Sequence, residues 1–265
     1  MKGMAYHGWK HGLPDKFWPV TLDNFFEIPD EIRELGLHMM ESDKVVKSSD
    51  EGGRWPGCRS ESLWHINEEM SQRITEKILS CYFNLNFEHI FWKFCNMPFQ
   101  LISSFDKDKN NIKNKGWIHK DSCDPRQSRL KPNPQEELLE PELAGLIYLT
   151  PDIERATGTS LFNIKKDKTL DDWDGTIEER IPLYKGDPVS DEEIKEKWER
   201  HRSCFIEKVR FENIYNRLIM YDTREWHGAN SYCTSKNNRL TLTFFIGGIH
   251  GKKWPLERIR ETKIN

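Results

Sequence analysis

From about residue 91 onward, the chain is dominated by short segments that favour β-strands. Seven of them follow one another, each rich in β-branched and aromatic residues and separated from the next by turn residues. Their sequences are FWKFCNMPFQLISSF, GWIHKD, LAGLIYL, TSLFNI, CFIEKVRF, RLIMYD and RLTLTFFI. Many short strands with turns between them are typical of a sandwich or a barrel. We therefore predict a mainly β domain over residues 91–265.

The residues before this domain have a helical pattern. PDEIRELGLHMM, residues 29–40, has helical spacing, and a second helix is predicted within NEEMSQRITEKILSCYF behind a cap at Asn67. Apolar residues recur at four-residue intervals in that second segment, at Met70, Ile74, Ile78 and Tyr82. The segment between the two helices, SSDEGGRWPGCRSES, is a predicted loop. We expect residues 1–90 to form a helical and loop extension packed on the β core.

One long polar segment interrupts the β region. Residues 165–203 are mostly polar and charged, and Ser190 and Glu193 have the spacing of a capping box for a short helix. Two interpretations remain open for this insertion. It is a solvated surface excursion, or it is a lid over a site at one end of the sheets.

Composition and charge exclude several classes of function. The 265 residues carry 40 basic and 43 acidic side chains, a net charge of −3, which argues against sequence-independent nucleic-acid binding. No stretch approaches the roughly 18 apolar residues that span a bilayer, and the first residues lack the apolar segment of a signal peptide. The six cysteines are scattered without a C-x-x-C pair, so we expect them to be reduced and the protein to be cytoplasmic.

Three residues have the types and spacing of a metal site. His119 and Asp121 lie two residues apart on a predicted strand, so both side chains leave the same face. A third ligand must come from another strand, and His227, just after the strand RLIMY, is the candidate. Two histidines and one carboxylate leave three coordination positions open, as in non-haem Fe(II) oxygenases.

A cation and a hydroxyl follow the third ligand on a strand of their own. Arg239 and Thr241 alternate onto one face of RLTLTFFI, twelve and fourteen residues after His227. Arginine can hold a carboxylate through two parallel hydrogen bonds, and threonine can donate another. Near an open iron site, this pair suits the distal carboxylate of 2-oxoglutarate.

In this order, His119-x-Asp121, His227 and Arg239-x-Thr241 resemble the 2-oxoglutarate and Fe(II)-dependent dioxygenases. The similarity is greatest to the prolyl-hydroxylase-like branch, through LIYLT with Tyr148, GTSLF and NRLIMYDTREWH, and it extends to small bacterial and phage oxygenases with a WPG.R loop. It covers about residues 117–249. The family has a double-stranded β-helix fold, a jelly roll of the cupin-like kind, with peripheral helices.

The resemblance implies cofactors and a reaction. They are Fe(II), 2-oxoglutarate and dioxygen, with ascorbate as a reductant, and Tyr148 would hydrogen-bond the co-substrate carboxylate. The reaction would be hydroxylation of a prolyl or other amino-acid residue, coupled to decarboxylation of 2-oxoglutarate to succinate. A free amino acid or another small molecule is the alternative substrate. Outside this class, a non-catalytic cupin-like protein that binds a metal or a ligand is the alternative.

Four further residues are candidates for substrate contact. Arg54, Trp55 and Arg59 lie together in the predicted WPG loop, and Trp117 precedes the first metal ligand by two residues. The simpler interpretation is an ordinary loop with one packed indole, and a second indole in the core. The N-terminal hundred residues and the insertion have no counterpart in the family pattern, so the substrate itself does not follow from it.

Overall fold

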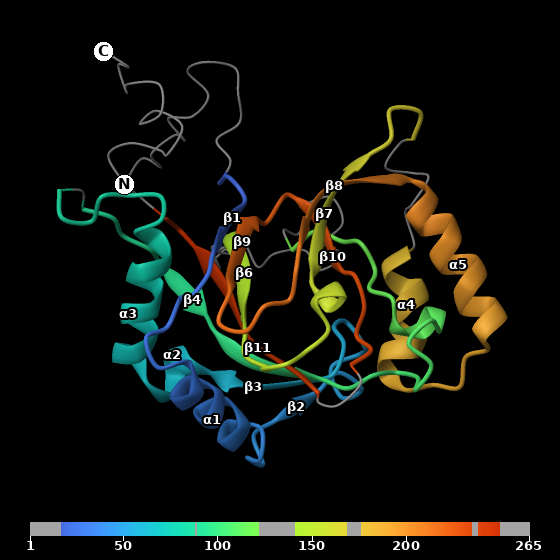
Figure 1. Cartoon of the computed structure of the whole chain (residues 1–265), viewed down its shortest axis with the longest axis horizontal. Coiled ribbons are helices and arrows are strands. Elements are labelled where there is room, and N and C mark those ends of the chain that lie inside the picture. The colour runs from blue at the N-terminus through green and yellow to red at the C-terminus, as the bar shows by residue number, and fades with distance from the viewer. Residues whose placement is uncertain (1–16, 88, 122–140, 169–175, 235–237, 250–265) are drawn as a thin grey trace, which may run out of the picture.

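The protein consists of two antiparallel β-sheets flanked by helices (Figure 1). This computed structural model describes residues 17–87, 89–121, 141–168, 176–234 and 238–249. The large sheet has the order β1-β9-β6-β11-β5-β3-β2, with β4 also paired to β11, and the small sheet has the order β10-β7-β8.

The strands of the large sheet are β1 (Val20–Leu22), β2 (Val46–Lys47), β3 (Cys58–Ser62), β4 (Phe94–Asn96), β5 (Pro98–Ile102), β6 (Pro141–Tyr148), β9 (Leu218–Asp222) and β11 (Arg239–Gly247). Those of the small sheet are β7 (Thr159–Ile164), β8 (Phe205–Phe211) and β10 (Trp226–Ala229). The helices are α1 (Pro29–Met39), α2 (Leu63–Ile66), α3 (Glu68–Leu79), α4 (Thr176–Lys185) and α5 (Asp191–Ser203).

The two sheets pack face to face around a shared apolar core. Leu146 and Tyr148 of β6 and Ile219 of β9 project from the large sheet and contact Leu161 of β7 and Phe211 of β8. Two packed antiparallel sheets with peripheral helices form a jelly roll of the double-stranded β-helix type. The predicted fold class is therefore confirmed.

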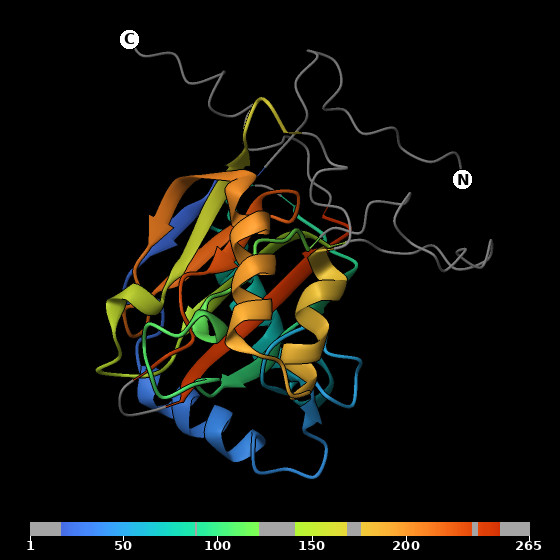
Figure 2. The ribbon, with the colours of Figure 1, turned by 90° about the vertical axis from the view of Figure 1, so that its right-hand side faces the viewer.

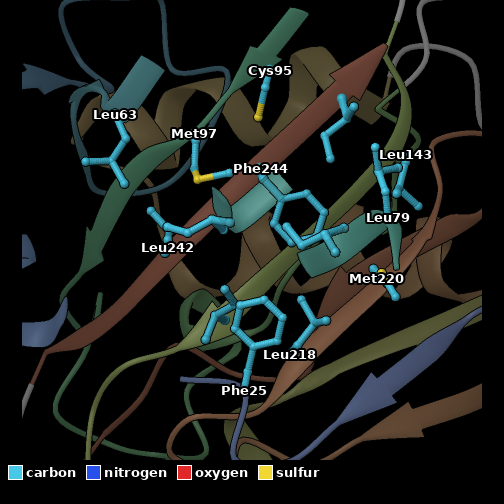
Figure 3. Close-up of a cluster of buried hydrophobic side chains, with 14 of the residues drawn as sticks. Phe25, Leu63, Leu79, Cys95, Met97, Leu143, Leu218, Met220, Leu242 and Phe244 are labelled. Atoms are coloured by element: carbon cyan, nitrogen blue, oxygen red, sulfur yellow. The ribbon is translucent and has the colours of Figure 1, made fainter. Parts of the chain in front are cut away.

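The other face of the large sheet is also buried. Along β11, Leu242 and Phe244 point to this outer face, where they pack with Leu63, Met97 and Leu218 beneath the N-terminal helices (Figure 3). The alternate residues of β11, among them Arg239 and Thr241, belong to the face that is turned to the small sheet. A strand covered on both faces has few polar positions. The arginine and threonine in this strand are exceptions to that pattern.

The N-terminal segment contains the two predicted helices. α1 begins with Pro29 at its first position, and the Asn67 side chain accepts a hydrogen bond from the amide of Met70 at the start of α3, as predicted. The same segment also contributes β1, β2 and β3 to the large sheet, which the sequence did not predict. These strands are two to five residues long, and CRSES in β3 is polar, so they lack the apolar alternation that marks a strand.

The prediction of a strand over GWIHKD was wrong. In the described part of that region, one isolated antiparallel bridge joins His119 to His227. The amide of each donates to the carbonyl oxygen of the other, at 2.8 and 2.9 Å. His227 itself lies on β10, a strand that the sequence did not indicate. A single bridge suffices to place the two histidine backbones side by side.

The insertion folds into α4 and α5, which stand side by side on the face turned to the viewer in Figure 2. Ser190 caps α5 and accepts a hydrogen bond from the amide of Glu193, which confirms the predicted start of this helix. Residues 169–175 of the insertion lie outside the described residues. Within the described ranges, no helix has both the length and the apolar character required to cross a bilayer.

Candidate functional site

The three predicted metal ligands converge at the mouth of the space between the two sheets. One ligand atom from each of His119, Asp121 and His227 lies within 4.8 Å of the others. The Nε2 atom of His227 is 3.2 Å from Oδ2 of Asp121, and that of His119 is 3.7 Å from Oδ1. The rings of the two histidines are 4.4 Å apart between centroids. The arrangement offers two imidazole nitrogens and one carboxylate to a single ion.

Backbone carbonyls fix the tautomer of both histidines. Nδ1 of His119 donates to the carbonyl oxygen of Trp117 at 2.9 Å, and Nδ1 of His227 donates to that of Glu225 at 3.0 Å. With the proton held on Nδ1, the lone pair of each neutral ring lies on Nε2, the atom that faces the other ligands. Metal-binding histidines usually have this second hydrogen bond, because it orients the ring. The donor set therefore fits a divalent transition metal.

The charge states of His119 and Asp121 suit metal binding. Burial, together with the neighbouring His227 and Arg180, lowers the pKa of His119 to about 3. Burial alone would raise the pKa of Asp121, but His227, His119 and Arg59 outweigh it and lower that pKa to about 2. Asp121 is thus a carboxylate and His119 a neutral base at ordinary pH, which are the forms that coordinate a metal.

Arg239 lies in the same pocket as the three ligands. The pocket contains about 650 Å³ of empty space, counting the part that is open to solvent, and Arg239 forms part of its wall. Its side chain is 3% exposed, and its Nε atom has no hydrogen-bond partner among the described residues. Its side chain also hydrogen-bonds the Tyr148 hydroxyl but pairs with no described carboxylate. Leaving a buried cation without a counterion is costly, so such a group is suited to an anionic ligand.

Thr241 and Tyr148 are neighbours of Arg239, although neither is among the residues that line the pocket. They are paired across β11 and β6, and both are fully buried. The Tyr148 hydroxyl donates to Oγ1 of Thr159 at 3.1 Å, and the Arg239 guanidinium lies 5.3 Å from the Tyr148 ring. Thr159, which does line the pocket, was not singled out in the sequence. The predicted contact of Tyr148 and Thr241 with the co-substrate stays a prediction.

The predicted WPG loop brings Arg54, Trp55 and Arg59 to the pocket wall. Gly57 has a φ of +77°, and a Cβ there would lie 2.2 Å from the carbonyl oxygen of Leu101, so the turn requires glycine. Trp117 is placed differently. Its indole packs in a buried cluster with Leu183 and Ile194 of the insertion, and it is absent from the pocket wall. This placement corresponds to the core-packing interpretation of Trp117.

The insertion takes part in the site in two ways that the sequence did not reveal. α4 carries Arg180 and Tyr184 to the pocket wall. α5 holds the segment that leads to the first metal ligand, because Nε1 of Trp198 donates to the carbonyl oxygen of Gly116 at 3.1 Å. The buried His201 lies 2.9 Å from the carbonyl oxygen of Ile118. The helices therefore form a wall of the site, whereas the interpretation of the insertion as a lid stays a prediction.

Aromatic side chains complete the pocket. Tyr221 of β9 lies 4.5 Å from the His227 ring, measured between centroids, and burial raises its pKa well above the usual value. The hydroxyls of Tyr184 and Tyr232 lie 3.4 Å apart on the side of the insertion. All three line the pocket and were not singled out in the sequence. Tyr221 stands in the apolar segment LIMYD, so it looks like a core residue until the fold shows that it borders a cavity.

No protein-family model and no curated protein sequence matches this chain. Among solved structures, it is similar to a prolyl hydroxylase from Trichoplax adhaerens in complex with a hypoxia inducible factor oxygen degradation domain peptide fragment. The identity is 12%, the TM-score 0.48, and the match covers 92% of this chain and 87% of the other.

A Pseudomonas putida prolyl-4-hydroxylase matches with 10% identity and a TM-score of 0.44, covering 86% of this chain and 91% of the other. The epimerase SnoN, in complex with Fe3+, alpha ketoglutarate and nogalamycin RO, matches with 11% identity and a TM-score of 0.46, covering 86% and 78%. At this level of similarity, the roles of individual residues must rest on the geometry of this chain.

Proposed function

We propose that the protein is an Fe(II)- and 2-oxoglutarate-dependent dioxygenase that hydroxylates a C–H bond. One observation carries the proposal. Two histidines and an aspartate that can share one ion open into the same pocket as Arg239, a buried guanidinium without a carboxylate partner among the described residues. A metal site alone would fit many functions. The added buried cation favours a co-substrate that binds the metal at one end and offers an anion at the other.

His119, Asp121 and His227 would hold the iron through Nε2, a carboxylate oxygen and Nε2. They occupy three positions and leave the rest open for other ligands. The two backbone hydrogen bonds to Nδ1 keep the rings in orientation whether or not an ion is bound. The carboxylate of Asp121 also favours hydroxylation over halogenation, by the family resemblance, since halogenating relatives have a small residue there.

Arg239 would bind the distal carboxylate of 2-oxoglutarate, with Thr241 and Tyr148 as further donors. Its burial excludes water from this contact, which strengthens a charge-assisted hydrogen bond. When bound, iron and 2-oxoglutarate supply the oxidation of a C–H bond by dioxygen, coupled to decarboxylation of 2-oxoglutarate to succinate. The chain itself holds these groups in orientation and, through aromatic residues such as Tyr221, limits the access of water.

For the substrate, the sequence resemblance favours a prolyl or other amino-acid residue in a peptide or protein. A free amino acid or another small molecule is the second candidate. A cupin-like protein that binds a metal without catalysis is the alternative from another class.

Anaerobic calorimetry on the full chain tests the proposed function. We expect one Fe(II) to bind per chain and 2-oxoglutarate to bind to the iron-loaded protein more tightly than to the metal-free protein. The Asp121→Ala variant should lose both steps, because the metal loses its carboxylate ligand. Binding of Fe(II) without any binding of 2-oxoglutarate would contradict the proposal and favour the cupin-like alternative.

A further inference from the structure

The wall of the candidate site is strongly cationic. Among the residues that line the pocket are four arginines, namely Arg54, Arg59, Arg180 and Arg239. Among the described residues, the same lining contains one carboxylate, Asp121, which the proposed function assigns to iron. Arg239 has a role in that function, and Arg54 is exposed to solvent. The charges of Arg59 and Arg180 are unexplained.

Arg180 reaches the pocket from α4 and is 7% exposed. One of its terminal nitrogens donates to the carbonyl oxygen of Arg54 at 3.1 Å, but its Nε atom has no partner among the described residues. No described carboxylate lies within 4 Å of its guanidinium. Arg180 lines the same pocket as the three metal ligands. A cation buried beside a metal site opposes metal binding, so its presence there needs a compensating anion.

Arg59 lies on β3, at the end of the WPG loop. Its guanidinium is 4.7 Å from the Trp55 ring and 5.8 Å from the Phe245 ring. Its buried Nε atom has no hydrogen-bond partner among the described residues, and burial lowers its pKa to about 10. Stacking on aromatic faces leaves the edge of a guanidinium free, and that edge is the part that matches a carboxylate or a phosphate.

Arg59 and Arg239 lie on different strands of the large sheet, β3 and β11. Arg59 pairs with Gln100 of β5, which pairs in turn with Thr241 of β11, so two strand spacings separate β3 from β11. That distance is about 10 Å between backbones. Arg59 stacks on Trp55, and Arg180 donates to the carbonyl oxygen of Arg54, so both arginines contact the WPG loop. Arg239 lies on β11, two strands away from Arg59.

With Fe(II) and 2-oxoglutarate bound, Arg59 and Arg180 would leave positive charge in the pocket wall without a counterion. The two positive charges of Fe(II) and the charge of Arg239 are offset by Asp121 and by the two carboxylates of 2-oxoglutarate. Among the described residues of the wall, what remains are the positive charges of Arg59, which is half-buried, and of the buried Arg180. Keeping such charges out of water without a counterion is unfavourable. A substrate with an anionic group would supply the counterion.

We propose that Arg59 and Arg180 form an oxyanion subsite for the oxidised substrate, which therefore carries a carboxylate or phosphate group. This inference rests on the proposed function. It favours a free acid, such as an unblocked amino acid, over a prolyl residue within a peptide, whose backbone is neutral. The two walls of the pocket would each contribute one arginine, so the substrate anion would bridge the WPG loop and the insertion.

The test uses the full chain loaded anaerobically with Fe(II) and 2-oxoglutarate. Acetate and inorganic phosphate are titrated separately at constant ionic strength, with acetamide as the neutral counterpart of acetate, and binding is followed by calorimetry. We expect saturable binding of at least one anion and none of acetamide. Binding of acetate alone identifies a carboxylate subsite, binding of phosphate alone a phosphate subsite, and binding of both a general oxyanion subsite.

Variants then assign the subsite. Arg59→Gln and Arg180→Gln should each weaken anion binding at least tenfold while the affinity for 2-oxoglutarate stays within twofold. Arg73→Gln, which removes an exposed guanidinium from α3, is the matched control and should change neither. The Arg59→Lys variant tests whether the anion needs two parallel hydrogen bonds, because lysine keeps the positive charge but lacks the paired donors of the guanidinium.

Two results would overturn the proposal. One is the absence of saturable anion binding by the loaded wild-type protein, a result that does not depend on how the variants fold. The other is a loss of 2-oxoglutarate affinity in Arg59→Gln or Arg180→Gln with unchanged anion binding, which would assign these arginines to the co-substrate. Failure of the proposed function is distinct from both, because the wild-type protein would then not bind 2-oxoglutarate at all.

Discussion

β11 and the α4–α5 insertion form two walls of the same pocket, and they differ in how they are supported. β11 runs through the large sheet, with apolar clusters on both of its faces. The insertion packs on a smaller cluster of its own, around Leu183, Ile194 and Trp117. Each wall nevertheless carries a buried arginine to the site, Arg239 on one side and Arg180 on the other. A binding residue can therefore be carried by a strand that is buried on both faces or by a peripheral pair of helices.

The largest effect is expected where the two walls meet, at the metal ligands. His227→Ala should abolish iron binding and any turnover of 2-oxoglutarate, because the remaining His119 and Asp121 come from one short segment and cannot enclose an ion. Metal analysis after dialysis and a succinate assay measure the two losses. Stoichiometric iron in this variant would show that the ligand set lies elsewhere.

The support of β11 is tested by Phe244→Ala. Phe244 is fully buried on the outer face of the sheet, so its loss should lower the free energy of unfolding by about 3–5 kcal/mol. Leu183→Ala in the insertion should cost about 2 kcal/mol, at the lower end for such a change, because the smaller cluster can relax. Denaturant unfolding measures both, and equal costs would contradict the distinction between the two walls.

The function of the β11 wall is tested by Arg239→Met. This change keeps much of the side-chain volume but removes the cation, and it should weaken 2-oxoglutarate binding by about 2–5 kcal/mol. Iron binding should be unchanged, since Arg239 contacts no ligand atom. Calorimetry with Fe(II) first and 2-oxoglutarate second separates the two steps. An unchanged affinity for 2-oxoglutarate would mean that another cation binds the distal carboxylate.

The supporting role of α5 is tested by Trp198→Phe. The variant loses the hydrogen bond from Nε1 to the carbonyl oxygen of Gly116, worth about 0.5–1.5 kcal/mol. We expect a tenfold or smaller loss of iron affinity, because the segment before His119 is held less firmly. Trp18→Phe, at a half-exposed position in the N-terminal segment, is the control. If both variants bind iron equally well, α5 does not position the ligand.

The smallest effect concerns the edge of the large sheet and is pH-dependent. Arg217 donates to both carboxylate oxygens of Asp23, at 2.5 and 2.9 Å, and this contact lowers the pKa of Asp23 from its ordinary value of 3.8. The pair is partly exposed, so Asp23→Asn should cost about 0.2–1 kcal/mol at neutral pH. The pKa of Asp23 is lower in the folded protein than in the unfolded chain, so the ion pair stabilises the fold above about pH 4. This stabilisation is lost as the pH falls through the folded-state pKa. Urea unfolding of both proteins at pH 7 and pH 3 measures it, and an equal difference at both pH values would exclude Asp23 as the cause.

The same two walls explain which parts of the site could be predicted. Arg239 stands in an apolar strand, where a cation is conspicuous and needs a reason. Arg180 stands in a segment where charged residues are the rule, so nothing in the sequence distinguishes it from its solvated neighbours. The ligand spacing predicted His119 and Asp121, but their backbone forms one bridge and not a strand, because that geometry depends on β10 far along the chain. Contacts between distant segments, such as the pairing of β3 with β5, cannot be predicted from the local pattern of apolar and polar residues.

Iron and 2-oxoglutarate are expected to react in the pocket between these walls. Formation of succinate from 2-oxoglutarate, measured with Fe(II) and ascorbate in air, is the decisive measurement. We expect succinate formation that requires Fe(II), is stimulated by a small carboxylic or phosphorylated substrate, and is absent in Asp121→Ala. Succinate formation at the same rate in the wild-type protein and in Asp121→Ala, or none in the wild-type protein above the rate without enzyme, would contradict it.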